Sequence, residues 1–289
     1  MPTTYLAYHY DGKLHTYETT TTSITPFSAL PEPTRALFKE GTDEHYVVTT
    51  AGTIFHPQGG GQPSDTGTME LLPSRPSTPP TKFTVHTARK SNNQVLHLGT
   101  FDSSSQLFTP GEIILQKIDP AKRLLHSRLH TAGHVLGGAV RQLLEDKIEG
   151  FDELKASHFP GSAACEFRGL IPGEWKGGIQ ERVREIVEGK VVVRVEWWRV
   201  GDFEERGLGR LLGGIAGDGD GDGDENGGEE EEGKEKKLRV VVIDGVETYP
   251  CGGTHVDTTD LCGEVLVKKI VRKSGVSKWL WYAGEQTRL

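Results

Sequence analysis

The chain has 289 residues, a mass of 31.7 kDa and only three cysteines, which excludes a small disulfide framework and leaves room for two modest domains. Hydrophobic residues make up 35 % of the chain, the mean hydropathy is −0.45, and the absence of a long apolar run excludes a transmembrane helix. The net charge of −8 argues at first against a nucleic-acid partner. However, residues 213–237 hold ten acidic residues and three lysines, so the remainder has a net charge of only −1. We expect this Gly/Asp/Glu-rich insert to be disordered.

The first part of the chain is rich in short β patterns. The Asp11-Gly12 pair predicts a hairpin, because both residue types tolerate positive φ. Its two strands would be Tyr5–Tyr10 and Leu14–Tyr17, and the further strand candidates are 46–50, 66–72, 82–86, 95–98 and 112–118. These segments predict a small β-barrel-like domain over residues 1–115.

The pattern changes at Asp119-Pro120, where aspartate suits a helix N-cap and proline the first helical position. Apolar residues then recur at helical spacing, which predicts a helix over about 120–146 with a weak point at Gly137-Gly138. Beyond it we expect a helix at 178–188 and strands at 163–167, 191–199, 238–243, 264–270 and 278–282. Helices against an antiparallel sheet predict an α+β domain over residues 116–289.

The long helix carries His126, His130 and His134 at intervals of four, so successive imidazoles lie on one face. Two such rings can bind one metal ion, and from spacing alone the first two histidines are as good a pair as the last two. Cys251 and His255 are the obvious further ligands, because the two glycines between them allow the backbone to bend tightly. Imidazole nitrogens with a thiolate suit zinc. Histidines are also common on packed helix faces, which is the alternative for an isolated pair.

These motifs resemble a known family. The sequence HTAGH at 130–134, followed far downstream by CGGTH at 251–255, resembles the editing domain of alanyl-tRNA synthetase and the free-standing, AlaX-type alanyl-tRNA editing proteins. The sequence FHPQGGGQPSDTG at 55–67 resembles the glycine-rich motif of that family, and the three motifs occur in the family's order. The resemblance implies one zinc ion per chain, bound by His130, His134, Cys251 and His255, and it leaves His126 outside the ligand set.

The resemblance also implies a function. The expected activity is hydrolysis, in trans, of tRNA(Ala) misacylated with serine or glycine, by a cytoplasmic monomer of the medium-length, two-domain form with no membrane partner. Two alternatives stay open: a catalytically inactive tRNA-binding module with a structural zinc, and an editing hydrolase for Ser-tRNA(Thr). Four ligands from the protein leave open whether zinc activates water or anchors the substrate.

Selectivity sets a clear physical demand, because serine differs from alanine by one hydroxyl and a pocket cannot exclude the smaller residue by size. It can instead leave its own buried polar groups unpaired when alanine enters. We expect Thr131 and Gln62 to act in catalysis or in reading the seryl hydroxyl. The expected substrate contacts are Gly59, Gly60, Gly61, Ser64, Asp65 and Thr254.

Basic residues outside the insert are candidates for phosphate contacts. They are Lys122, Arg123 and Arg128 on the long helix and Lys268, Lys269, Arg272, Lys273 and Lys278 near the end of the chain. Solvated helix and strand faces are the alternative for both groups. The candidates for stacking on bases are Trp197, Trp198, Trp279 and Trp281, although the alternation of the last two is more typical of one buried strand face.

Overall fold

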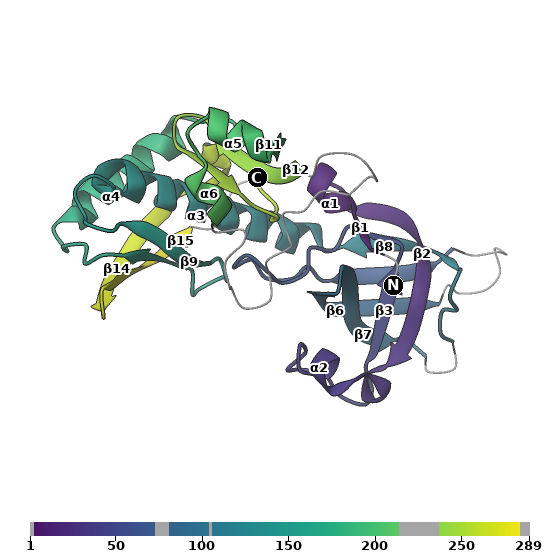
Figure 1. Ribbon diagram of the computed structural model, residues 1–289. Helices are drawn as coiled ribbons and strands as arrows, with labels where there is room; N and C mark the ends of the chain where they lie inside the picture. The colour runs from purple at the N-terminus through teal and green to yellow at the C-terminus, as the bar shows by residue number, and fades with distance from the viewer. Residues whose placement is uncertain (1–2, 73–80, 104–105, 214–236, 284–289) are drawn as a thin grey trace. The chain divides into compact units, whose positions relative to one another are not determined.

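The computed structural model describes residues 3–72, 81–103, 106–213 and 237–283 (Figure 1). The chain divides into two compact units: unit 1 comprises Met1–Gly59 and Pro63–Arg123, and unit 2 comprises Gly60–Gln62 and Leu124–Leu289. Most of the predicted acidic insert, residues 214–236, lies outside the described residues.

Unit 1 is built around a closed six-stranded barrel in the order β2-β3-β7-β6-β5-β8 (Figure 1, purple to blue). Its strands are β2 (Thr16–Pro26), β3 (Tyr46–Thr50), β5 (Gly67–Leu71), β6 (Lys82–Ser91), β7 (Gln94–Phe101) and β8 (Ile113–Ile118), with the short helices η1 (Phe27–Ala29) and α2 (Glu32–Arg35) between β2 and β3. All barrel pairs are antiparallel. Alternate residues fill the interior, among them Val48, Met69 and Phe83, which are fully buried. The structure therefore confirms an α+β protein that contains a small barrel.

The predicted hairpin at Asp11-Gly12 is wrong. Tyr5–Leu6 is a short strand, β1, which pairs in parallel with β4 (Gly52–Thr53), and Ala7–Tyr10 is a single helical turn, α1. The N–H of Asp11 closes that turn on the carbonyl of Ala7 at 3.1 Å. Three consecutive residues of the turn are buried, a pattern that a strand with one solvated face does not produce.

The long helix is α3 (Pro120–Leu144). As predicted, Asp119 caps it, since its carboxylate accepts hydrogen bonds from the backbone N–H groups of Ala121 and Lys122 at 3.0 and 3.1 Å. The glycine pair at 137–138 does not interrupt the helix. One face of α3, including Leu129, Val135 and Leu136, is buried in the core of unit 2.

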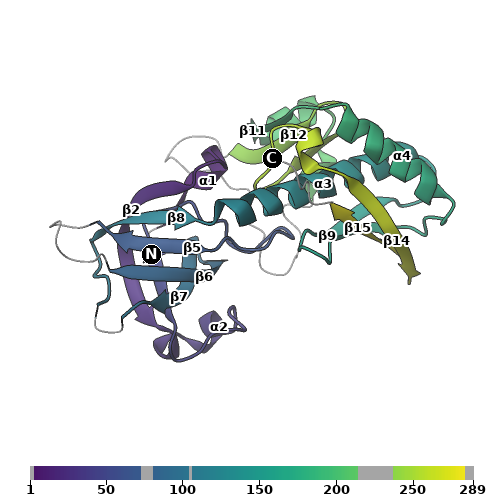
Figure 2. The same cartoon turned by 180° about the vertical axis from the view of Figure 1, so that it is seen from behind.

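Unit 2 packs helices against two antiparallel sheets (Figure 2). A four-stranded sheet runs β14-β15-β10-β9, and a three-stranded sheet runs β11-β12-β13. The elements are β9 (Asp152–Ser157), β10 (Ala164–Arg168), α4 (Trp175–Glu188), β11 (Val193–Arg199), α5 (Val200–Glu205), α6 (Arg210–Gly213), β12 (Lys237–Ile243), β13 (Glu247–Pro250), η2 (Thr259–Cys262), β14 (Val265–Lys273) and β15 (Val276–Ala283). The strands β9 and β13 are additions to the predicted set. None of the described helices is long and apolar enough to cross a membrane.

Candidate metal centre

Two histidines of α3 face the same point in unit 2. His130 and His134 lie one turn apart, and their rings stack with centroids 5.1 Å apart and an interplanar angle of 13°. His130 is only 2 % exposed. The four-residue spacing thus places both imidazoles on one face, as the sequence predicts.

The loop after β13 brings two further donors to these rings. The Sγ atom of Cys251 lies 3.4 Å from Nε2 of His130 and 3.4 Å from Nε2 of His255. One donor atom from each of the four residues lies within 4.8 Å of the others. The four predicted ligands therefore converge, and His126 is not a member of this cluster.

Each imidazole of the cluster also contacts a polar group with its other nitrogen. Nδ1 of His130 lies 2.7 Å from Oε1 of Gln62, and Nδ1 of His255 lies 3.2 Å from Oγ1 of Thr131. Nδ1 of His134 lies 3.5 Å from the carboxylate of Glu247, which sequence reasoning missed. Such outer contacts fix the tautomer and orientation of ligand histidines, leaving Nε2 of each ring for the metal.

Neighbouring charges and burial shift the pKa values of His134 and Glu153. Burial lowers its pKa, but the neighbouring Cys251 thiol and Glu247 carboxylate together raise it to about 10. Burial, followed by the charge of Glu247, raises the pKa of Glu153 to about 8. A bound cation would therefore replace a proton at a site whose surroundings already favour positive charge.

The backbone of the CGGTH loop approaches the helix closely. A Cβ atom at Gly253 would lie 2.1 Å from Cε1 of His130, so a larger residue would displace the ligand ring. The buried guanidinium of Arg239, on β12, donates to the carbonyl of Cys251. Glycine and arginine thus fix where the thiol lies, and Arg239 is a second residue that sequence reasoning missed.

A third missed residue is His158, which follows β9 and stacks on His130 with ring centroids 4.3 Å apart. A Cβ atom at Gly133 would lie 2.2 Å from Cε1 of His158, which explains the glycine between the two helical ligands. Burial, followed by the charge of His134, lowers the pKa of His158 to about 3, so this ring is neutral. Its backbone N–H donates to the carbonyl of Gly61 at 2.8 Å. His158 therefore contacts both the metal cluster, through the ring of His130, and the glycine-rich motif, through the carbonyl of Gly61.

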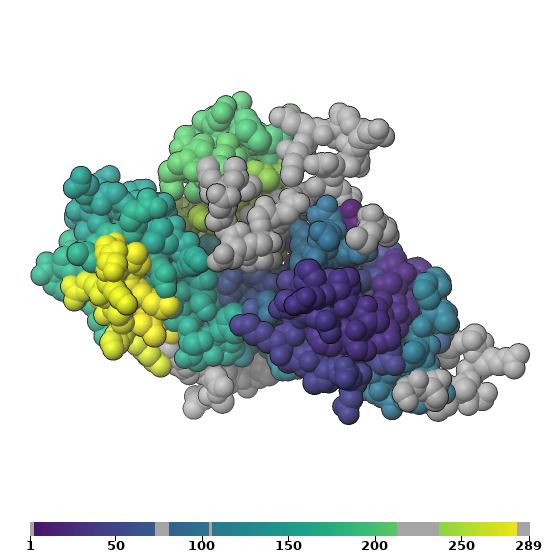
Figure 3. All heavy atoms as spheres, turned by 60° about the horizontal axis from the view of Figure 1, so that its bottom comes forward, coloured from purple at the N-terminus to yellow at the C-terminus, as the bar shows by residue number. Residues whose placement is uncertain are grey.

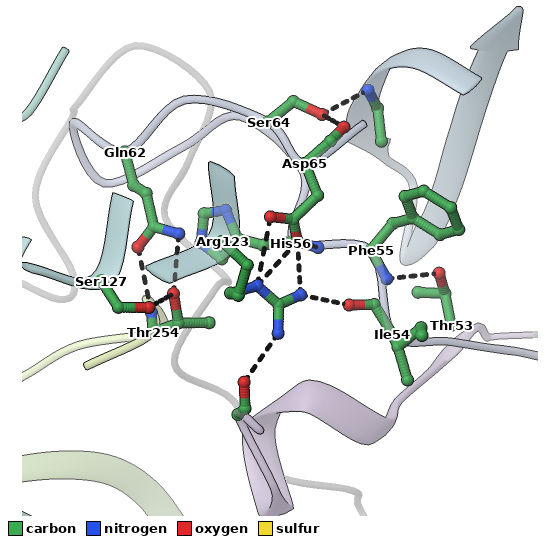
Figure 4. Close-up of polar contacts among 12 residues, drawn as sticks. Thr53, Ile54, Phe55, His56, Gln62, Ser64, Asp65, Arg123, Ser127 and Thr254 are labelled. Atoms are coloured by element: carbon green, nitrogen blue, oxygen red, sulfur yellow. Dashed lines mark hydrogen bonds and ion pairs between the residues drawn. The ribbon is translucent and has the colours of Figure 1, made fainter. Parts of the chain in front are cut away.

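The glycine-rich motif is divided between the two units. Gly60 and Gly61 adopt positive φ values of 51° and 76°, and with Gln62 they belong to unit 2. The Gln62 side chain donates from Nε2 to Oγ1 of Thr254 and accepts the Thr254 N–H at Oε1, both at 3.0 Å (Figure 4). The hydroxyl of Ser127 lies 2.7 Å from that of Thr254. These contacts join the glycine-rich motif to both metal-binding motifs.

The rest of the motif belongs to unit 1. Asp65 is buried, pairs with the buried guanidinium of Arg123 and accepts the His56 N–H at 2.7 Å (Figure 4). Ser64 donates to the Asp65 carbonyl and accepts the Ala88 N–H. A substrate contact for Ser64 or Asp65 stays a prediction. Arg123, expected among the phosphate-binding residues, is only 2 % exposed and is instead committed to this ion pair.

The donor set fits zinc. Three imidazole nitrogens and one thiol lie within reach of a single ion, and Nε2 of His134 is a buried atom without a hydrogen-bond partner. An unpaired buried nitrogen is costly unless something binds it. The residues present therefore fit a metal ion bound by nitrogen and sulfur donors.

Sequence comparisons agree with this geometry. Residues 238–280, which include Cys251 and His255, match the family described as the Threonyl and Alanyl tRNA synthetase second additional domain. Alanine-tRNA ligase of Methanosarcina mazei is 28 % identical over 267 residues, 88 % of this chain and 25 % of the ligase. Alanine-tRNA ligase of Korarchaeum cryptofilum is 29 % identical over 216 residues, 74 % of this chain and 21 % of the ligase. The chain is an AlaX-like relative of the alanyl-tRNA editing domain.

The similarity of this editing-domain relative to the ligases extends over most of the chain. A third alanine-tRNA ligase, from Pyrococcus furiosus, is 26 % identical over 84 % of this chain and 24 % of its own length. The chain thus spans about a quarter of the length of these ligases. The activity, substrates and partners of the whole ligases therefore apply to this chain only as proposals.

Proposed function

We propose that this protein hydrolyses the aminoacyl ester of tRNA(Ala) misacylated with serine or glycine, acting in trans with one zinc ion. The observation that carries the proposal is the convergence of His130, His134, Cys251 and His255 in a relative of the alanyl-tRNA editing domain. Its three cysteines form no disulfide and are all buried, which suits the reducing cytoplasm. We propose that the protein acts there as a monomer.

The reaction adds water to the ester carbonyl and breaks the bond between the carbonyl carbon and the ribose oxygen. The ribose oxygen takes a proton, and free amino acid and tRNA leave. Bound zinc would supply a Lewis acid for the carbonyl or lower the pKa of a water molecule. Gln62, Thr131 and Glu247 hold the three imidazoles so that their Nε2 atoms stay deprotonated and converge.

Thr131 is the best candidate for sensing the seryl hydroxyl. When Nε2 of His255 is a ligand, its Nδ1 carries the proton and donates to Oγ1 of Thr131, which also accepts the Val256 N–H at 3.2 Å. Both acceptor positions of the threonine oxygen are then used, and its own proton remains to be donated to a substrate oxygen. An alanyl substrate would leave that buried donor unpaired.

The other expected substrate contacts divide into two groups. Gly59, Gly60, Gly61 and Thr254 would contact the terminal adenosine and the amino acid. Gly61 bonds the N–H of His158 and Thr254 bonds Gln62, and the side chains of both partners contact His130. Ser64 and Asp65 would act by holding the motif, since their polar groups already bond within unit 1.

The decisive assay incubates the chain with Ser-tRNA(Ala), Ala-tRNA(Ala) and Ser-tRNA(Thr), with and without a chelator. Rapid, chelator-sensitive loss of serine from tRNA(Ala), with the alanyl ester spared, is the expected result. Loss of Ser-tRNA(Thr) instead would favour the threonyl-type hydrolase. No loss from any substrate, with tRNA still bound, would favour an inactive binding module with a structural zinc.

A further inference from the structure

The hairpin of β14 and β15 carries an unusual concentration of positive charge. Residues 265–283 hold five basic residues and no acidic one. The basic residues, here called the hairpin cations, are Lys268, Lys269, Arg272, Lys273 and Lys278, and all five are exposed. Figure 3 shows part of this segment (yellow) on the surface of unit 2.

The fold accounts for the exposure of these side chains. β14 is the edge strand of its sheet, and the hairpin turns at Ser274 and Gly275, which both have positive φ. The register shifts between Val267 and Lys269, so the lysine pair at 268–269 occupies a bulge. Four of the hairpin cations therefore lie on the edge strand, and Lys278 lies on the neighbouring strand β15. Gln180 of α4 bonds the backbone of Val265 and Val267, so the edge is covered at the start of β14.

Part of this positive charge has no neighbouring carboxylate within the described residues. Lys278 pairs with Glu166 of β10 at 2.8 Å. Within the described residues, Lys269, Arg272 and Lys273 make no ion pair. Lys176 of α4 adds a further cation, since its Nζ donates to the Lys268 carbonyl at 2.8 Å. Between Lys269 and Lys273 the strand extends about 13 Å, long enough to meet more than one phosphate.

The tryptophans of the hairpin do not add a stacking surface. Trp279 and Trp281 are 0 % and 3 % exposed and belong to the core of unit 2. The prediction that they stack on bases is therefore wrong for the folded chain, and the alternative of a buried strand face is confirmed. Contact through this edge would rest on charge and would read phosphates rather than bases.

We propose that the hairpin cations bind the phosphate backbone of the tRNA substrate. This inference rests on the proposed function, and it names the surface that binds the tRNA body. Charge complementarity with the polyanionic backbone identifies the occupant. Lysines on an edge strand also prevent pairing with other chains, so the test must separate a binding role from a solubilising one.

The experiment compares the full chain carrying Lys269→Glu and Lys273→Glu with a control carrying Lys39→Glu and Lys190→Glu. Both pairs are exposed and both variants change the net charge equally. The first measurement is the Kd for uncharged tRNA(Ala) across a salt series. We expect the hairpin variant to bind tRNA at least 10-fold more weakly than the wild type. The slope of log Kd against the logarithm of the salt concentration should be smaller by about two, because two cations are lost. The control should match the wild type.

The second measurement compares hydrolysis of Ser-tRNA(Ala) with that of a short seryl-CCA ester. The hairpin variant should show a raised KM for the whole tRNA and unchanged kinetics on the short ester, which also shows that the site is folded. Equal Kd values for the hairpin variant and the control, or a wild type that does not bind tRNA, would overturn the inference. Failure of the proposed function is seen separately, as a wild type that hydrolyses neither ester.

Discussion

Oε1 of Gln62 lies 2.7 Å from Nδ1 of His130 and also accepts the backbone N–H of Thr254 at 3.0 Å. One buried amide oxygen therefore orients a helical metal ligand and fixes the CGGTH loop. The glutamine that ends the glycine run thus positions the metal centre, whatever contact it makes with substrate.

Replacing this amide should weaken metal binding. In Gln62→Leu, Nδ1 of His130 and the Thr254 N–H lose their acceptor, so we expect the Kd for zinc to rise by about 10- to 100-fold. A competition titration with a chromogenic chelator measures it. Gln58→Leu is the matched control from the same motif, because among the described residues Gln58 bonds through its backbone N–H, to Ala88, and not through its side chain. Equal zinc affinity in the two variants would contradict this role.

Thr131 should determine the preference for seryl over alanyl ester while it contacts the predicted metal ligand His255. Thr131→Val keeps the shape but removes the oxygen that contacts His255 and the Val256 N–H, whereas Thr131→Ser retains it. We expect the valine variant to lose about 10-fold or more of the preference for seryl over alanyl ester, and the serine variant to keep most of it. The ratio of kcat/KM on the two charged tRNAs is the measurement. An unchanged ratio in the valine variant would remove Thr131 as the hydroxyl sensor.

The buried ion pair of Asp65 and Arg123 should stabilise unit 1. The guanidinium also donates to the carbonyls of Gly12 and Ile54, at 2.7 and 2.5 Å, so Asp65→Asn leaves a buried positive charge without its counterion. We expect the free energy of opening of the barrel to fall by about 3 kcal/mol. Amide hydrogen exchange in β5 and β8 reports it.

A partly exposed pair in the same barrel supplies the comparison. Glu70 bonds Lys117 at 2.6 Å, with side chains 24 % and 41 % exposed, so Glu70→Gln should cost less than about 1 kcal/mol. If Asp65→Asn and Glu70→Gln lower the free energy of barrel opening by similar amounts, burial of the ion pair does not determine the size of the effect.

His97 should make the barrel acid-sensitive. It is fully buried, with Nδ1 at 2.9 Å from the Val48 carbonyl and Nε2 at 2.9 Å from the Thr53 hydroxyl. Burial lowers its pKa from 6.5 to about 4, although the bond to Val48 acts in the opposite direction. Between these values the unfolded chain binds a proton that the folded barrel does not, so stability falls as the pH falls. The loss is about 3 kcal/mol from pH 7 to pH 4.

The variant His97→Gln isolates the contribution of His97 to the loss of barrel stability in acid, because glutamine does not bind a proton between pH 7 and pH 4. Amide exchange in β3 and β7, corrected for intrinsic rates, should show a steeper loss with acid in the wild type than in the variant. Tryptophan fluorescence does not report the barrel, since all five tryptophans lie in unit 2. Parallel curves for the two proteins would contradict a neutral, buried His97.

The local patterns predicted much of the fold. The apolar spacing of 120–146 and the cap at Asp119 follow from interactions within one or two helical turns, so sequence alone reveals α3. The strand β9 was missed because its residues, DELKAS, alternate weakly and none of them is fully buried. The turn at Ala7–Tyr10 is not evident from the sequence, because its burial comes from tertiary packing: Ala7 belongs to the core cluster of unit 1 and the Tyr8 ring contacts His56.

The residues of the candidate site also fall into those that local sequence predicts and those that only tertiary packing brings together. His130 and His134 are fixed by helix geometry, and the downstream ligands were found through motif resemblance. Glu247 and His158 contact the cluster through tertiary packing. Neither belongs to a motif of fixed spacing, so the sequence pattern does not identify them. A weak signal was Gly133, since a glycine between two helical ligands indicates a close neighbour, here the His158 ring.

The most direct test of zinc-dependent editing measures serine release from Ser-tRNA(Ala) while zinc is titrated into the metal-free chain. We predict that the rate rises with added zinc and reaches a plateau at one equivalent, and that Cys251→Ser lowers the plateau or requires far more zinc. Full activity of the metal-free chain, unchanged by zinc or by the loss of Cys251, would contradict this function.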